Sequence, residues 1–139
     1  MLVKTTWNEK MRFNSELDGH KIILDAGASS GGDDKGPRPK ALLLTALSGC
    51  TGMDVVSILR KMKVAEHKFW IEVDADSTDV HPKVYSKIYM NYVFEGDNLP
   101  KDKIKKAVKL SEESYCGVSA MLKKACEIVT KIIVNGEEI

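Results

Sequence analysis

A long apolar segment with a cysteine near its middle constrains the fold of this chain most. It runs from Pro39 to Lys63, and the residues from Ala41 to Leu47 are apolar almost all the way round a helix. Such a helix is typical of a protein interior rather than of a surface. Polar residues become frequent only from Asp54 onward. We therefore expect a central helix whose first half is buried and whose far end reaches solvent.

Two glycines stand close to the cysteine of this segment. Gly49 and Gly52 flank Cys50, and each costs about 1 kcal/mol relative to alanine inside a helix. Such positions usually have a packing or functional reason. Small neighbours would let another backbone or a ligand approach the sulfur. A buried structural cysteine in a closely packed helix explains the same pattern, so both interpretations stay open on these residues alone.

Length and charge exclude several classes of protein. The chain has 139 residues, which predicts a single domain over residues 1–139 with a sizeable core. Its 21 basic and 20 acidic residues give a net charge of +1 and are spread along the chain, so neither nucleic acid nor a membrane surface is an expected partner. No uninterrupted apolar run reaches the ~18 residues of a membrane span. Because Met1 to Trp7 does not resemble a signal peptide, we predict a cytoplasmic protein.

The cysteines and histidines give no disulfide or metal signature. Three cysteines in a cytoplasmic chain argue against a disulfide framework. The histidines, His20, His67 and His81, show no ligand spacing with one another or with a cysteine. We therefore predict neither a metal nor another bound cofactor.

The first quarter of the chain predicts an antiparallel β-meander. Strands are expected over Leu2–Trp7, Met11–Leu17 and His20–Asp25, with Asp18-Gly19 as a two-residue hairpin turn. The glycine- and serine-rich stretch from Ala26 to Pro37 shows no apolar periodicity, which is typical of a mobile loop. It lacks the spacing of a phosphate-binding loop.

The remaining elements complete an α+β domain. Alternation and helix-capping signals predict five elements after the central helix: strands Phe69–Asp76 and Val84–Phe94, helices Asn98–Ser114 and Gly117–Ala125, and a strand Glu127–Val134. The expected order is βββ-α-ββ-αα-β, in which a mostly antiparallel sheet wraps around one buried helix.

Two of the cysteines are candidates for chemistry. Cys116 precedes the predicted helix at Gly117, where free backbone N–H groups favour the thiolate form. Cys50 lies in the middle of a helix, so a neighbouring cation would have to activate it. The local sequence alone therefore ranks Cys116 as the better thiolate. Cys126 falls on the same face as Ile128 and is expected to be in the core.

These motifs together resemble a known family. The residues that carry the resemblance are Gly36-Pro37-Arg38-Pro39, Leu42-Leu43-Leu44, Ala46-Leu47, Ser48-Gly49-Cys50-Thr51, Asp54-Val55 and Tyr115-Cys116-Gly117-Val118-Ser119. They are similar to the OsmC/Ohr superfamily, which comprises osmotically inducible protein C and the organic hydroperoxide resistance proteins. The resemblance covers nearly the whole chain, because the predicted order of elements is also that of the family. Within the family, this chain looks closest to the less characterised OsmC-like branch.

The resemblance implies both an activity and an assembly. Characterised members are intertwined homodimers that reduce organic hydroperoxides in stress responses, with active sites at the subunit interface. The resemblance makes Cys50 the peroxidatic cysteine, which becomes a sulfenic acid, and Cys116 the resolving cysteine, which closes a disulfide. This assignment reverses the ranking from the helix terminus. It also implies an external dithiol reductant and no metal.

The chain departs from the family at the groups that activate the thiolate. Characterised reductases carry a glutamate ten residues before the peroxidatic cysteine, and it holds an arginine from the N-terminal β region against the thiolate. Lys40 occupies the glutamate position here, and Arg12 is the sole arginine of the predicted meander. Arg38 is the next candidate, so Arg12, Arg38 and Lys40 are the predicted substrate-binding or thiolate-activating residues. We therefore expect a weaker peroxidase, and the alternative function is a small hydrophobic ligand-binding protein on the same fold.

Overall fold

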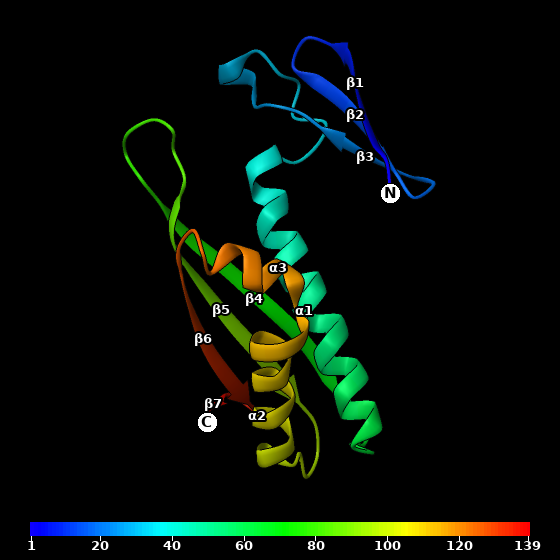
Figure 1. The fold of residues 1–139 in the computed structure, drawn as a ribbon, viewed down its shortest axis with the longest axis vertical. Coiled ribbons are helices and arrows are strands. Elements are labelled where there is room, and N and C mark those ends of the chain that lie inside the picture. The colour runs from blue at the N-terminus through cyan, green and yellow to red at the C-terminus, as the bar shows by residue number, and fades with distance from the viewer. The chain divides into compact units, whose positions relative to one another are not determined.

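The computed structural model describes residues 1–139, which group into two compact units, Met1–Thr45 and Ala46–Ile139. Figure 1 shows the elements of each unit along the chain. The predicted order of elements is confirmed, with one addition, the short strand β7 (Glu137–Glu138) after the last predicted strand. The fold is α+β with a long central helix, as the sequence indicated.

The first unit contains the predicted meander. Its antiparallel sheet has the order β1 (Val3–Glu9), β2 (Arg12–Leu17) and β3 (His20–Leu24). Leu17 pairs with His20 across the hairpin, and both turn residues, Asp18 and Gly19, have positive φ angles of 49° and 80°. Such a pair of left-handed residues matches the twist of the flanking strands, which explains the Asp-Gly signal.

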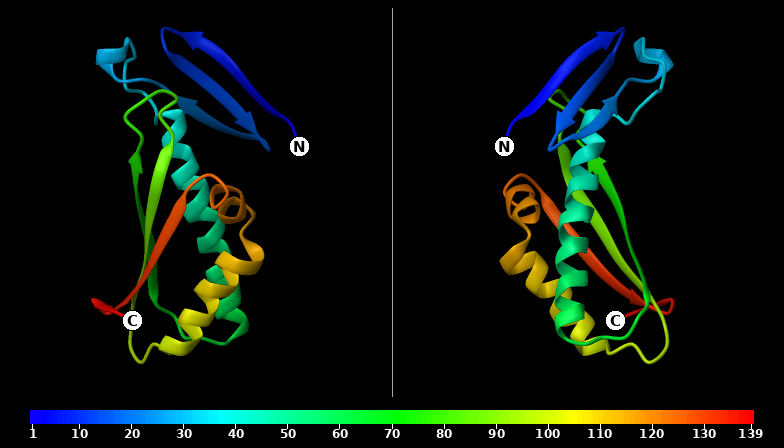
Figure 2. Two further views of the ribbon diagram at one scale, coloured as in Figure 1. Left: turned by 60° about the vertical axis from the view of Figure 1, so that its left-hand side comes forward. Right: turned by 90° about the vertical axis from the view of Figure 1, so that its right-hand side faces the viewer.

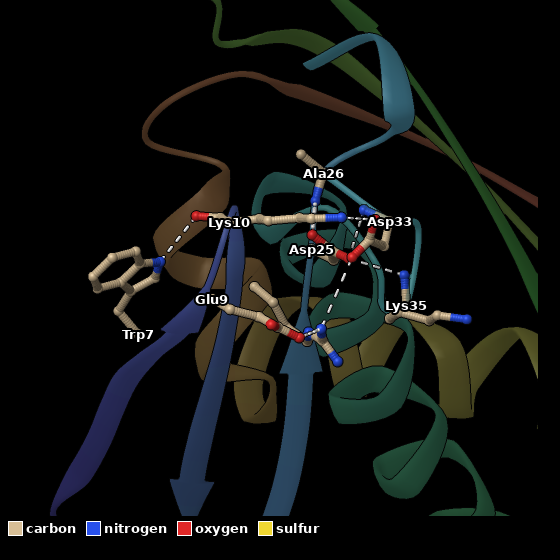
Figure 3. A network of polar contacts seen from close by, with 8 residues as sticks. Trp7, Glu9, Lys10, Asp25, Ala26, Asp33 and Lys35 are labelled. Carbon is tan, nitrogen blue, oxygen red and sulfur yellow. Dashed lines mark hydrogen bonds and ion pairs between the residues drawn. The ribbon is translucent and has the colours of Figure 1, made fainter. Parts of the chain in front are cut away.

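The loop after β3 is more organised than the sequence predicted. It contains two short 3-10 turns, η1 (Ala28–Ser30) and η2 (Pro39–Ala41). The buried Asp25 carboxylate accepts hydrogen bonds from the backbone N–H groups of Ala26, Asp33 and Lys35 at 2.8, 3.2 and 3.0 Å (Figure 3). A side chain at Gly32 would place its Cβ 2.1 Å from the carbonyl oxygen of Ala26. The glycine is therefore required by close backbone packing, not by a phosphate.

The second unit is built on a four-stranded sheet with the order β4 (Lys68–Ser77), β5 (Tyr85–Glu95), β6 (Glu127–Val134) and β7. Strands β4 and β5 are antiparallel, as expected for a hairpin, whereas β6 runs parallel to β5. The parallel pairing follows from the two helices that connect β5 to β6, because a helical crossover returns the chain in the same direction. The single sheet predicted from the sequence is therefore wrong, since the strands form two sheets.

Two helices cover one face of this sheet. Figure 2 shows α2 (Lys101–Leu110) beside the Ala46–Lys61 part of α1 (Leu42–Lys61), both on the same side of the strands. The side chains between these layers are apolar and almost fully buried: Leu47, Val55, Leu59, Ile88, Met90, Tyr92, Phe94, Ile104, Ala107, Val108 and Val134. Burying each of the larger ones stabilises the fold by roughly 1.5–3 kcal/mol.

Helix α1 is buried along one stripe, not all round. Its buried residues recur every four positions at Leu47, Thr51, Val55 and Leu59, whereas Met53 on another side is 76% exposed. The first half of this helix is therefore not buried within one chain, contrary to the prediction, because one sheet and α2 cover only one side. By length and composition, Pro39–Lys61 would also pass as a membrane span, with 23 residues and a mean hydropathy of 1.7. Uninterrupted apolar runs do not reveal this property, because polar residues such as Ser48 and Asp54 interrupt the helix.

Candidate active site

Three side chains with metal-binding or nucleophilic atoms meet in the second unit. The sulfur atoms of Cys50 and Cys116 and a carboxylate oxygen of Asp54 all lie within 4.8 Å of one another. Both cysteines are free thiols. The structure thus brings together the two cysteines that the sequence singled out, and it adds an aspartate that the sequence analysis did not select.

Cys50 and Asp54 share one face of α1 because they are four residues apart. Residues at this spacing lie one helical turn apart on the same face. Thr51, between them in sequence, is buried, and its hydroxyl donates to the carbonyl oxygen of Leu47 at 3.0 Å. Thr51 therefore sits on the core side of the helix without an unpaired hydroxyl, while Cys50 stays partly exposed.

A π-helical segment, η3 (Ser111–Tyr115), carries the chain from α2 to Cys116. The sequence predicted that α2 continues through Ser114, but the α-helical part ends at Leu110. The backbone N–H of Cys116 donates to the carbonyl oxygen of Ser111 at 2.8 Å, five residues back. Such π turns are rare and often occur at functional sites. Here the turn places both Ser111 and Cys116 against α1.

Ser111 connects this turn to α1. Its hydroxyl is fully buried and donates to Asp54 Oδ2 at 3.0 Å, with a second, longer contact of 3.4 Å to the carbonyl oxygen of Thr51. A hydrogen bond to a carboxylate is stronger than one between neutral groups. Ser111 therefore fixes the orientation of the Asp54 carboxylate next to the two thiols.

Glu112 anchors the same turn to the sheet. Its Oε1 atom accepts from the Tyr92 hydroxyl of β5 at 3.3 Å and from the Thr130 hydroxyl of β6. Burial raises the pKa of Tyr92 above its ordinary value, so this hydroxyl stays protonated and serves as a donor. The backbone that carries Cys116 is consequently fixed from two strands.

The environment of Cys116 favours its neutral thiol. Cys116 caps α3 (Gly117–Leu122), and its sulfur accepts from the Ser119 backbone N–H at 3.3 Å, as the sequence suggested for a helix terminus. Burial nevertheless raises the pKa of Cys116 to about 11, and the hydrogen bond to the Cys50 sulfur adds to this. The expectation that the helix N-terminus favours the thiolate form of Cys116 is therefore wrong, because desolvation outweighs the helix N-terminus.

The three basic residues predicted to activate the thiolate all belong to the first unit. Arg12 pairs with Glu9 and lies 3.9 Å from Asp33, and Arg38 pairs with Asp34 at 2.7 Å. Lys40 lies in η2. Their activating role stays a prediction.

Cys126 is only half-buried, and its thiol contacts the carbonyl oxygen of Leu122 at 3.7 Å.

An open groove lies between α1 and β4, and Gly49, next to Cys50 in the sequence, is one of its lining residues. It has a volume of about 810 Å³, and its apolar lining includes Gly49, Gly52, Met53, Val56, Phe69 and Trp70. A Cβ atom built at Gly49 would meet no atom within 4 Å. The small residues beside Cys50 thus leave space that this chain does not itself fill.

Comparison with known proteins identifies the fold. A family model described as OsmC-like protein matches residues 32–131, which include both cysteines. The chain belongs to the OsmC-like family. The family resemblance stated from the sequence motifs is thereby confirmed.

Relatives match the OsmC-like chain over nearly its whole length. It is 32% identical over 129 residues to protein YhfA of Escherichia coli K12, covering 92% of this chain and 93% of the relative. A hypothetical protein from Aquifex aeolicus is 31% identical and superposes with a TM-score of 0.85, covering 99% of this chain and 97% of that one. Helix α1 is the long central helix that these OsmC-like structures share.

A more distant relative shares the fold alone. An organic hydroperoxide resistance protein OsmC from Legionella pneumophila has 13% identity and a TM-score of 0.71, and the match covers 96% of both chains. At such low identity the comparison establishes the arrangement of elements. The functional argument for the OsmC-like chain therefore depends on its own thiol site.

Proposed function

We propose that this OsmC-like protein is a thiol-dependent peroxidase that reduces organic hydroperoxides with Cys50 and Cys116. The observation that carries the proposal is the approach of the two sulfurs, which come from different helices and lie within 4.8 Å of each other. A disulfide requires an S–S distance near 2.05 Å, so a modest local movement would join them. Membership in the OsmC-like family supports the proposal.

The proposed reaction has three steps: oxidation of Cys50, disulfide formation and reduction of the disulfide. The Cys50 thiolate attacks the terminal peroxide oxygen of ROOH, the O–O bond breaks, and the products are a Cys50 sulfenic acid and an alcohol after proton uptake. The Cys116 thiol then attacks the sulfenic sulfur, which forms the disulfide and releases water. An external dithiol finally reduces the disulfide by thiol exchange and becomes a disulfide itself. No metal or bound cofactor takes part in these steps.

The different exposure of the two thiols supports this division of roles. Cys50 is partly exposed beside the glycines of α1, so a peroxide can reach it. Cys116 is only 3% exposed, and its raised pKa keeps it protonated until Cys50 has been oxidised. A buried resolving thiol next to an accessible peroxidatic thiol would favour the internal disulfide over reaction with other molecules.

We further propose that the active protein is a cytoplasmic homodimer of the oxidative or osmotic stress response. The exposed side of α1, with Met53 at 76% exposure and open space at Gly49, is the kind of apolar helix surface that a second copy would bury. The assembly is tested by sedimentation. A folded species with the mass of one chain at micromolar concentration would contradict it.

Mass spectrometry tests the peroxidase directly. Reduced protein is treated with one equivalent of an organic hydroperoxide, alkylated and digested. The expected product is a Cys50–Cys116 disulfide, with Cys126 alkylated as an internal control. Sulfonic acid alone, or three alkylated thiols, would count against the proposal. Consumption of the hydroperoxide with several dithiols then identifies the reductant.

The groove supports a second candidate function. Its apolar lining and its volume of about 810 Å³ suit a small hydrophobic ligand, and Arg60 and Lys61 are also among its lining residues. In this alternative, the protein binds a ligand and the cysteines have no redox role. Unreactive cysteines at pH 7 together with a co-purified hydrophobic molecule would favour this function over the peroxidase.

A further inference from the structure

We propose that the reduced protein binds one thiophilic divalent cation, of the Zn²⁺ type, through Cys50, Asp54 and Cys116. The sequence predicted no metal because its histidines show no ligand spacing with one another or with a cysteine. The structure instead brings together three donors from α1 and from the N-terminus of α3, with all three donor atoms within 4.8 Å of one another. Two sulfurs and one carboxylate oxygen are all ligands that zinc accepts.

The distances suit a single ion after small side-chain adjustments. Zinc lies about 2.3 Å from a cysteine sulfur and about 2.0–2.2 Å from a carboxylate oxygen. In a tetrahedral site these bond lengths place two donors roughly 3.5–3.8 Å apart. Donors that lie within 4.8 Å of one another must therefore approach by about 1 Å to share one ion. Cys50 and Asp54 are one turn apart on α1, so both can turn toward a cation placed between them and Cys116.

Neighbouring hydrogen bonds already orient two of the three donors. Ser111 donates to Asp54 Oδ2 at 3.0 Å, and the Ser119 N–H points at the Cys116 sulfur at 3.3 Å. Such contacts around a metal site fix the ligands and increase affinity. Binding releases the two thiol protons to solvent. Three protein donors also leave a fourth position for water or an external ligand, which is typical of open zinc sites.

Metal binding and disulfide formation would exclude each other. A sulfur bonded to zinc cannot attack a peroxide or join a second sulfur without leaving the metal. The metal site does not depend on peroxidase activity, because it requires only the reduced thiols and Asp54. Failure of the peroxidase test would therefore leave the metal proposal intact.

Cobalt titration of the reduced full-length protein tests the site. Co²⁺ replaces Zn²⁺ in such sites, and thiolate ligands give a charge-transfer band in the near ultraviolet. We expect one Co²⁺ per chain, loss of the band in Cys50→Ser, and at least tenfold weaker binding in Asp54→Asn. The matched control Cys126→Ser should bind normally. No band in the parent, a band that survives in Cys50→Ser, unchanged affinity in Asp54→Asn, or loss in Cys126→Ser would overturn the proposal.

Alkylation of the unmodified chain provides a test that needs no variant. Zn²⁺ should slow the reaction of iodoacetamide with Cys50 and leave the rate at Cys126 unchanged, as measured by mass spectrometry of each peptide. Equal protection of both cysteines, or of neither, would contradict binding at this cluster.

Discussion

Two buried or half-buried aspartates, one in each unit, serve opposite purposes. Asp25 accepts three backbone N–H groups from the loop that follows it, and Lys10 and Arg12 contact Asp33 of the same loop (Figure 3). Asp54 instead accepts one hydroxyl, from Ser111, and faces two thiols. The first carboxylate is saturated by the backbone that it organises, whereas the second is held in place beside reactive atoms.

This difference separates a carboxylate that organises a loop from one that lies beside two thiols. A carboxylate that is surrounded by backbone donors has a lowered pKa and stabilises the loop, because its charged form is the one that the donors prefer. A carboxylate held by one hydroxyl next to sulfur keeps coordination sites for a cation or a proton. Charge alone therefore does not distinguish the candidate site, whereas the proximity of Asp54 to two thiols does.

The largest expected effect is the loss of peroxide reduction in Cys50→Ser. Replacing the attacking sulfur by a hydroxyl should lower the rate of hydroperoxide consumption by about a thousandfold or more. The rate is measured with an excess of dithiol at neutral pH. Cys126→Ser, which changes the thiol outside the cluster, should retain the parent rate. If Cys50→Ser retained activity, the cluster of Cys50, Asp54 and Cys116 would not be the site of peroxide reduction.

The next effect concerns the reactivity of the buried Cys116 thiol and its dependence on pH. With a pKa of about 11, Cys116 should be alkylated roughly a hundredfold more slowly at pH 8 in the native protein than after denaturation. Cys50→Ala removes the partner that helps to raise this pKa, so the pH profile of Cys116 alkylation should move to lower pH. Peptide mass spectrometry over pH 7–11 measures both. Faster alkylation of Cys116 than of Cys50 in the parent would restore the ranking from the helix terminus.

Local sequence patterns were sufficient for most of the fold. The Asp18-Gly19 turn, the alternation of β4 and β5 and the closing strand Glu127–Val134 all depend on neighbouring residues, and the structure confirms them. The parallel direction of β6 and the division into two sheets depend on the packing of distant elements. These features could not be predicted from periodicity alone.

The site was predictable in part, for the same reason. The motifs around Cys50 and Cys116 were visible in the sequence, and Asp54 could have been found because it lies one helical turn from Cys50. Ser111, however, reaches Asp54 across 57 residues, through a π turn that no pattern indicated. The raised pKa of Cys116 likewise comes from burial, which a single sequence does not show.

A smaller effect is expected from the basic residues near η2. If a cation from this region stabilises the Cys50 thiolate, Lys40→Ala or Arg38→Ala should slow iodoacetamide modification of Cys50 at pH 7 by about threefold to tenfold. Lys21→Ala, which removes an exposed lysine of β3, is the control. If Cys50 of the parent is already fully reactive at pH 6 and neither variant slows the modification, the activating group lies elsewhere, and the expectation of a weaker peroxidase based on Lys40 was wrong.

The smallest effect tests the structural aspartate. The hydrogen bond from the Lys35 N–H lowers the pKa of Asp25 most, and those from Ala26 and Asp33 act in the same direction. Because the pKa in the folded protein is below the ordinary value of 3.8, the stabilisation is complete above that value and is lost as the pH falls through the lowered pKa. Asp25→Asn keeps one acceptor oxygen but not the charge, so its melting temperature should be about 5 °C below the parent at pH 6. The difference should shrink between pH 4 and pH 2.

Melting curves followed by circular dichroism measure it, with Glu16→Gln on the exposed face of β2 as the control. A difference that stays constant or grows in acid would show that the Asp25 charge does not stabilise the loop, and the contrast with Asp54 would fail.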